Sequence, residues 1–294
     1  MSRLEWQRDG LDWPNRHASH FIQAAGFRWH VQKMGEGPAL LLVHGTGAAT
    51  HSWGGLLPLL AKHFTVVAPD LPGHGFSELP RTSRLSIPGM AHAMAELLQV
   101  MDFKPAICVG HSAGVAAVAR MTLDRLIDPR LIIGINAAVM PFRGLAGQVL
   151  IPVAQMFFRN PLMAYIYAWS ADPEKVEKVI VSTGSNIDAK SLELYARLFQ
   201  NSGHVAGALG MMARWNLAPL VRELPKLSTP ITLVVGCNDR TVQPDEAVEV
   251  AATMWPQAKV IPLKGLGHLA HEERPPEVAD VIIQEARLAG ILGA

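Results

Sequence analysis

Charge and cysteine are both scarce in this chain of 294 residues. Charged residues make up 17% of it and hydrophobic residues 49%, a balance that is apolar but typical of a globular protein. With a formal net charge of +1 and no long basic run, the sequence gives no support to nucleic-acid binding. It lacks a run of about 18 apolar residues, so we expect no membrane-spanning helix. The N-terminus has no apolar core of the kind found in secretory signals.

The chain has two cysteines, Cys108 and Cys237, and both fall in or at the end of apolar, strand-like runs. If a third strand separates these two, the cysteines lie about 10 Å apart. A disulfide requires Cα atoms closer than about 7 Å. We therefore predict two buried thiols, a reducing compartment and a cytoplasmic protein.

Apolar runs and helical patterns alternate along most of the chain. The predicted strands are residues 19–23, 27–32, 39–43, 64–68, 106–109, 131–135, 231–235 and 258–263. The predicted helices are residues 53–62, 87–101, 115–120, 245–254 and 276–288, with Ser86 as a cap. This order predicts an α/β fold in which helices cover both faces of a mostly parallel, eight-stranded sheet.

One segment, residues 141–225, breaks the alternation because its pattern is mostly helical. We predict that it is a helical lid inserted into a core of residues 1–140 and 226–294. Methionine and aromatic side chains crowd the segment, which fits either an ordinary helix core or the wall of an adaptable apolar pocket. The predicted pocket residues are His111, Trp53, Met156, Phe157, Met211, Met212 and Trp215.

The pentapeptide Gly110-His111-Ser112-Ala113-Gly114 lies between a predicted strand and a predicted helix. A G-x-S-x-G element in this position is typical of a nucleophile elbow, a strained turn that presents the serine. Glycine is required two residues to either side because a larger side chain would collide with the turn. An ordinary turn of small residues can have the same sequence, so the interpretation of Ser112 depends on a base and an acid elsewhere.

A nucleophilic serine needs a base, and the base needs an acid that orients it. Asp239 and His268 each follow a late strand, which gives the chain order Ser, Asp, His of α/β-hydrolases. Asp245 competes with Asp239 but falls deeper in a helical pattern, and Asn136 has no charge with which to stabilise an imidazolium. His271 lies three residues after His268, but no further ligand set accompanies this pair. We therefore predict no metal site and no cofactor.

The oxyanion of an acyl-transfer intermediate needs two amide donors. We predict the amide of Ala113, directly after the serine, and the amide of Thr46 in the loop His44-Gly45-Thr46-Gly47. Gly47 is the alternative to Thr46, and His44 is expected to brace the loop. Asp70, at the start of a proline-glycine turn, is interpreted as scaffold.

With these motifs in place, the chain resembles the α/β-hydrolase superfamily over nearly its whole length. Residues 12–16, 44–53, 110–114 and 136–138 further resemble the BchO family, hydrolase-like proteins of bacteriochlorophyll biosynthesis often labelled magnesium-chelatase accessory proteins. The resemblance implies a role in photosynthetic pigment synthesis, with an apolar ester or tetrapyrrole as substrate and magnesium chelatase as a partner. Two functions stay open: a serine esterase, and a non-catalytic tetrapyrrole-binding accessory factor for magnesium chelatase.

Other chemistries of this fold are less well supported. Haloalkane dehalogenases and epoxide hydrolases use an aspartate nucleophile where this chain has Ser112, whereas carbon–carbon bond hydrolases use the same triad and stay open. A phosphate-binding G-x-x-x-x-G-K-[ST] loop is absent. Residues 150–159 are apolar with a basic end, which predicts peripheral contact of the lid with the inner or photosynthetic membrane.

Overall fold

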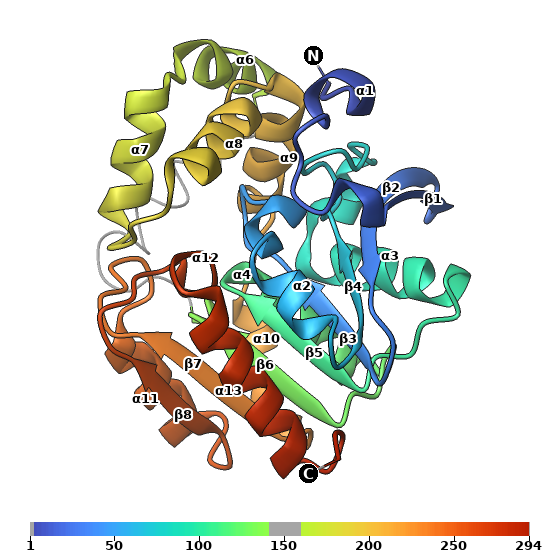
Figure 1. Ribbon diagram of the computed structural model, residues 1–294, viewed down its shortest axis with the longest axis vertical. Coiled ribbons are helices and arrows are strands. Elements are labelled where there is room, and N and C mark those ends of the chain that lie inside the picture. Colours follow the sequence, from blue (N-terminus) through green and yellow to red (C-terminus); the bar gives the residue numbers. More distant parts are fainter. Residues whose placement is uncertain (1–2, 141–159, 294) are drawn as a thin grey trace.

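Eight strands form one sheet in the computed structural model, which describes residues 3–140 and 160–293 (Figure 1). The strands are β1 (Ser19–Ala24), β2 (Phe27–Met34), β3 (Ala39–Val43), β4 (Thr65–Pro69), β5 (Ile107–His111), β6 (Leu131–Ile135), β7 (Ile231–Gly236) and β8 (Lys259–Leu263). Their order is β1-β2-β4-β3-β5-β6-β7-β8, with antiparallel pairing at β1–β2 and β2–β4 and parallel pairing elsewhere. The predicted fold class is confirmed.

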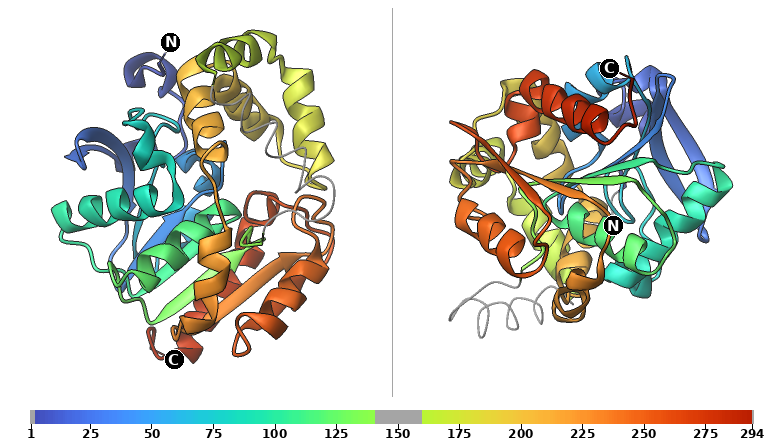
Figure 2. Two further views of the ribbon diagram at one scale, coloured as in Figure 1. Left: turned by 180° about the vertical axis from the view of Figure 1, so that it is seen from behind. Right: turned by 90° about the horizontal axis from the view of Figure 1, so that it is seen from below.

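Helices cover both faces of the sheet, which explains why its central strands are continuous apolar runs. One face is covered by α2 (Leu56–Leu60) and α13 (Pro275–Leu288), in front of the sheet in Figure 1. The other face is covered by α3 (Ile87–Val100), α4 (Ala113–Leu123) and α11 (Pro244–Thr253), seen from behind in Figure 2. All residues of β5, β6 and β7 are buried, as expected of parallel strands between two helical layers.

The element boundaries agree with the predicted ones to within two residues, except at two helices: α4 ends three residues after the predicted helix 115–120, and a second predicted helix is divided. The predicted helix of residues 53–62 is a 3₁₀ turn, η2 (Thr50–Trp53), followed by the short α2, because the Gly54-Gly55 pair separates them. The predicted cap is confirmed, since Ser86 Oγ accepts a hydrogen bond from the Gly89 amide at 3.2 Å. The remaining short elements are α1 (Trp6–Asp9), η1 (Arg16–Ala18), η3 (Thr82–Leu85) and α12 (Ala270–Glu273).

Helices α6 (Pro161–Ser170), α7 (Pro173–Ser182), α8 (Ala189–Phe199) and α9 (Ser202–Met212) lie beyond the carboxyl ends of the parallel strands (Figure 1). Side chains of Asn160, Asp172, Asp188 and Asn201 accept hydrogen bonds from first-turn amides of these helices, which marks each start clearly. The next elements, α10 (Ala218–Glu223) and η5 (Leu224–Lys226), contact α4 and place Leu220 and Leu224 in the core. The lid boundaries stay a prediction, and the predicted membrane segment 150–159 lies outside the described residues.

The two cysteines are separated by β6, as expected, and both are free thiols. Cys108 is buried in β5, but the prediction that Cys237 is buried is wrong. Cys237 is the first residue after β7, where the chain leaves the covered part of the sheet, and its side chain is exposed. Within the described ranges, no helix is long and apolar enough to cross a membrane.

Candidate active site

Ser112 occupies a strained turn between β5 and α4. Its φ of 51° and ψ of −120° lie in a backbone region that residues other than glycine rarely adopt. The flanking glycines are sterically required: a Cβ on Gly110 would lie 2.7 Å from the Val115 amide nitrogen, and a Cβ on Gly114 would lie 2.2 Å from the Val43 carbonyl oxygen. The local geometry therefore matches that of a nucleophile elbow.

Asp239 and His268 form a buried hydrogen-bonded pair on the loops that follow β7 and β8. His268 Nδ1 lies 2.8 Å from Asp239 Oδ2, and the Asp239 side chain is fully buried. The other carboxylate oxygen accepts hydrogen bonds from the amides of Thr241 and Val242, at 2.7 and 3.0 Å. With both oxygens engaged, Asp239 holds the imidazole in one orientation. The competing Asp245 is exposed in the first turn of α11.

Two residues that precede the predicted lid segment hold the backbone of His268. The carbonyl oxygen of His268 accepts hydrogen bonds from His111 Nε2 at 2.9 Å and from Asn136 Nδ2 at 2.8 Å. His111 was expected on a pocket wall, but it is only 3% exposed and serves as a brace for the candidate base. Burial lowers the pKa of His111 well below its usual range, so the ring is neutral at pH 7.

The hydroxyl of Ser112 has no hydrogen-bond partner among the described residues, His268 included. Among the described residues, the candidate triad therefore has its Asp–His hydrogen bond but no Ser–His hydrogen bond. Such a bond is often long in an unliganded hydrolase and shortens when substrate binds. Ser112 is half-buried, which leaves its hydroxyl within reach of a ligand.

The loop of residues 44–47, here called the oxyanion loop, passes directly over Ser112. A Cβ on Gly45 would lie 3.0 Å from the Ser112 Cβ. His44 Nδ1 donates to the Gly45 carbonyl oxygen at 2.8 Å, and His44 Nε2 accepts from the Leu71 amide at 2.8 Å. Because a trans peptide directs its carbonyl and amide to opposite sides, this bond orients the Thr46 amide. The expectation that His44 braces the loop is confirmed.

The amides that were predicted to bind the oxyanion have no hydrogen-bond acceptor within the described part of the chain. Neither the Thr46 amide nor the Ala113 amide donates a hydrogen bond there, and the same holds for Gly47. Thr46 is half-buried and its hydroxyl donates to Met211 Sδ at 3.5 Å. The choice between Thr46 and Gly47 stays a prediction.

Asp70 has the scaffold role that was expected of it. Its carboxylate accepts hydrogen bonds from the amides of Thr50, at 2.6 Å, and Phe76, at 2.8 Å, and it contacts His30 Nδ1 at 2.7 Å. These bonds fix the proline-glycine turn beside the oxyanion loop.

The predicted pocket residues fall into different environments. Trp53 is fully buried in the core between α2 and α13, with its ring against His271 at a centroid distance of 4.5 Å, and Met211 is also fully buried. Both are therefore packing residues in this structure rather than exposed pocket walls. Met212 is 43% exposed and Trp215 is half-buried, whereas Met156 and Phe157 lie outside the described residues.

Several histidines beside the site are deeply buried, which the sequence analysis did not predict. His271 lies between Trp53 and His111, and neither of its ring nitrogens has a hydrogen-bond partner in the described structure. Burial lowers the pKa of His271 to about 3, and that of His51 also to about 3. Among the described residues, no three His, Cys, Asp or Glu side chains come together as metal ligands.

Sequence reasoning also missed two contacts from the helices of residues 160–212. His204 on α9 contacts the Gly47 carbonyl oxygen through Nε2 at 3.1 Å and accepts from the Gly75 amide through Nδ1 at 3.0 Å. The loop between α7 and α8 contacts the backbone near Asp239 and His268. No local pattern in the sequence signals these contacts, because each joins residues far apart in the chain.

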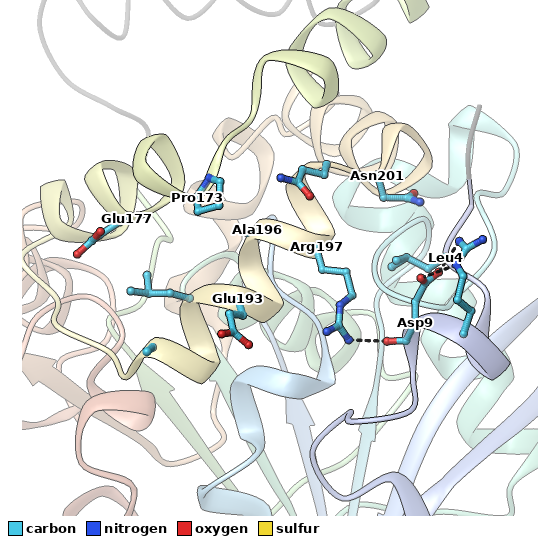
Figure 3. Close-up of a pocket in the computed structure, with 12 residues that line it drawn as sticks. Leu4, Asp9, Pro173, Glu177, Glu193, Ala196, Arg197 and Asn201 are labelled. Atoms are coloured by element: carbon cyan, nitrogen blue, oxygen red, sulfur yellow. Dashed lines mark hydrogen bonds and ion pairs between the residues drawn. The ribbon is translucent and has the colours of Figure 1, made fainter.

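A hollow of about 690 Å³ lies elsewhere, between α7, α8 and the N-terminal segment (Figure 3). Its arginines are already paired: Arg197 donates to the Asp9 carbonyl oxygen and to Asp12, and Arg8 donates to Asp9. Among the described residues that line it, none belongs to the candidate triad or to the oxyanion loop. The hollow is therefore separate from the candidate active site.

A family model for the alpha/beta hydrolase family matches residues 40–281, a span that includes the elbow, the acid and the histidine. The chain belongs to this family. The chain is 36% identical over 275 residues to the magnesium-chelatase 30 kDa subunit of Rhodobacter capsulatus, a match that covers 92% of this chain and 95% of that protein. This similarity agrees with the resemblance to the BchO family.

One further relative and one structural neighbour of the chain have esterase names. The chain is 26% identical over 266 residues to the pimeloyl-[acyl-carrier protein] methyl ester esterase of Aeromonas hydrophila, covering 86% of this chain and 96% of that one. The structure of a thermophilic esterase from Thermogutta terrifontis superposes with a TM-score of 0.73 at 22% identity, covering 92% and 98% of the two chains. The structural likeness shows the shared fold.

Proposed function

We propose that the protein is a serine hydrolase that cleaves a carboxylic ester of an apolar substrate. The observation that carries the proposal is the convergence of three features from distant parts of the chain. A strained Ser112 lies beneath the oxyanion loop, and the buried Asp239–His268 pair is held beside the elbow by His111. A chain without acyl-transfer chemistry has no need for this combination.

In the proposed reaction, Ser112 Oγ attacks the ester carbonyl carbon while His268 Nε2 takes the hydroxyl proton. Asp239 stabilises the imidazolium that forms, and the Thr46 and Ala113 amides bind the oxyanion. Collapse of the tetrahedral intermediate expels the alcohol, which receives its proton from His268. Water then attacks the acyl-enzyme by the same route and releases the acid.

The pigment-related relative suggests the substrate class. Tetrapyrroles of the bacteriochlorophyll pathway carry ester groups on a large apolar macrocycle. We therefore propose that the physiological ester is one of a tetrapyrrole and that the protein acts alongside magnesium chelatase. Identification of the tetrapyrrole that accumulates in a strain without the protein tests this assignment directly, and normal pigment in that strain contradicts it.

A fluorophosphonate probe tests the chemistry, because it reacts with activated serines. We expect the native protein to be labelled and Ser112→Ala not to be. Ser182→Ala is the matched control, since Ser182 is exposed at the end of α7 and its hydroxyl donates to the Val179 carbonyl oxygen. Equal labelling of the native protein and Ser112→Ala would remove the basis for a catalytic serine.

A non-catalytic, tetrapyrrole-binding accessory role for magnesium chelatase is the second candidate. Two observations favour it: the name of the Rhodobacter capsulatus relative, and the lack of a hydrogen bond between Ser112 and His268 in the described structure. Complementation separates the two. If Ser112→Ala restores pigment to a deletion strain as well as the native chain does, the accessory role is correct and the esterase role is not.

A further inference from the structure

The loop between α7 and α8, residues 183–188, packs against the loop that contains Asp239. Gly184 has a φ of 85°, and a Cβ at this position would lie 1.9 Å from the Asn238 carbonyl oxygen. The Arg240 amide donates to the Thr183 carbonyl oxygen at 3.0 Å. The backbone on both sides of the candidate acid is therefore in direct contact with a loop that joins two helices of the predicted lid.

The same loop also holds the backbone that carries His268. Ser185 is 3% exposed, and its Oγ accepts a hydrogen bond from the Leu269 amide at 2.8 Å. A Cβ on Gly267 would lie 2.5 Å from the Ser185 amide nitrogen, so any larger residue at position 267 would collide with the α7–α8 loop. Ser185 thus contacts the residues on either side of His268.

Bonds to the peptide groups around His268 come from the adjacent Glu273 and from three residues far away in the chain. Glu273 Oε1 accepts from the Gly267 amide at 2.7 Å, and Ser185 accepts from the Leu269 amide. The His268 carbonyl oxygen is held by His111 and Asn136. Of these supports, Ser185 is the one that comes from the helical segment beyond the strand ends. It therefore links the position of α7 and α8 to the position of the base.

We propose that Ser185 is a positioning residue for His268, acting through the Leu269 amide, and that correct seating of the α7–α8 loop is part of assembling the active site. The inference rests on the proposed function, since it assigns His268 as the base. Loss of the Ser185 hydroxyl leaves the buried Leu269 amide without its acceptor, so the histidine backbone shifts to find another. A small displacement of a general base is costly because proton transfer depends steeply on geometry.

The test compares Ser185→Ala with Ser185→Thr, which restores a hydroxyl, and with Ser182→Ala as the matched control. Turnover is measured with p-nitrophenyl butyrate, and the hydrogen bond between His268 and Asp239 is followed by the downfield proton NMR signal of His268 Nδ1–H. This signal is assigned by its loss in His268→Ala. We expect Ser185→Ala to lower kcat about tenfold, to leave KM nearly unchanged and to shift or broaden the NMR signal. We expect Ser185→Thr to recover both properties and Ser182→Ala to change neither.

Native kcat and an unshifted signal in folded Ser185→Ala would overturn the proposal. If Ser185→Ala does not fold, Ser185→Cys takes its place, since a thiol is a weak acceptor of similar size; native kcat and signal in that variant overturn the proposal equally. A native protein that neither turns over the ester nor reacts with fluorophosphonate contradicts the proposed function instead. The NMR comparison still decides the role of Ser185 in that case, because the signal does not depend on turnover.

Discussion

The side-chain amide of Asn136 donates a hydrogen bond of 2.8 Å to the backbone carbonyl oxygen of His268. The same nitrogen donates to the Gly267 carbonyl oxygen at 2.9 Å, and Asn136 Oδ1 accepts from the Gly236 amide at 2.8 Å. Asn136 itself has a φ of 46°, a conformation that asparagine tolerates better than most residues. One buried amide therefore joins the ends of β6 and β7 to the loop that carries the candidate base.

Asn136→Asp is expected to destabilise the protein although the two side chains have the same shape. The carboxylate cannot donate, so both carbonyl oxygens lose a partner and face a negative charge in a buried site. We expect a loss of about 2–3 kcal/mol in the free energy of unfolding, measured by urea denaturation at pH 7. Asn216→Asp is the control because Asn216 is exposed and its Oδ1 only accepts, from the Ala218 amide. Equal effects of the two substitutions would contradict this role for Asn136.

Much of the fold could be predicted from the sequence because the central strands are buried on both faces. A run such as Leu131–Ile135 must be apolar throughout, and its bounds were predicted without error. The residues of the candidate triad could also be proposed from the sequence, since loops that follow parallel strands meet at one edge of the sheet. His268 and Asp239 are 29 residues apart in the chain, yet their hydrogen bond follows from the order of β7 and β8.

Contacts that depend on how distant side chains pack could not be predicted in this way. Trp53 belongs to an amphipathic-looking segment, but nothing local reveals that its ring lies against His271 in the core rather than in a pocket. Ser185 lies in a segment with no strand-like or catalytic pattern, and its partner is 84 residues away. Cys237 directly follows an apolar run, and its exposure depends on where the covering helices end. In each case the deciding information is tertiary.

Asp239→Asn is expected to abolish most esterase activity while it preserves the fold. The amides of Thr241 and Val242 need an acceptor, so the asparagine oxygen stays with them and its NH₂ group faces His268 Nδ1. Nδ1 must then accept, which leaves the proton on Nε2, the nitrogen that the mechanism requires as a base. We expect kcat for p-nitrophenyl butyrate to fall by about 10³–10⁴-fold with a nearly unchanged urea midpoint. Asp245→Asn, an exposed position on α11, should retain native kcat, and a comparable loss there would shift the acid role to Asp245.

The buried histidines His271 and His51 contribute to stability in a way that is lost on mild acidification. For His271 the pKa falls from 6.5 to about 3 on folding, because burial disfavours the charged ring. Between these two values this residue binds more protons in the unfolded chain than in the folded one, so the contribution of His271 to the free energy of unfolding is greatest above pH 6.5 and falls as the pH is lowered. At pH 5, His271 alone accounts for about 2 kcal/mol of this fall. His51, whose pKa is lowered to about 3 by the same burial, adds a similar amount.

His271→Phe tests the prediction, because the imidazole packs against Trp53 and His111 and gives up no hydrogen bond within the described structure. We expect the variant to lose about 2 kcal/mol less stability than the native protein between pH 7 and pH 5, measured by urea denaturation at both pH values. The comparison of slopes is independent of any constant change in packing that the larger ring causes. His20→Phe, at an exposed position on β1, should keep the native slope. A His271→Phe slope equal to that of the native protein would show that His271 takes up its proton in the folded state and that the buried ring is solvated.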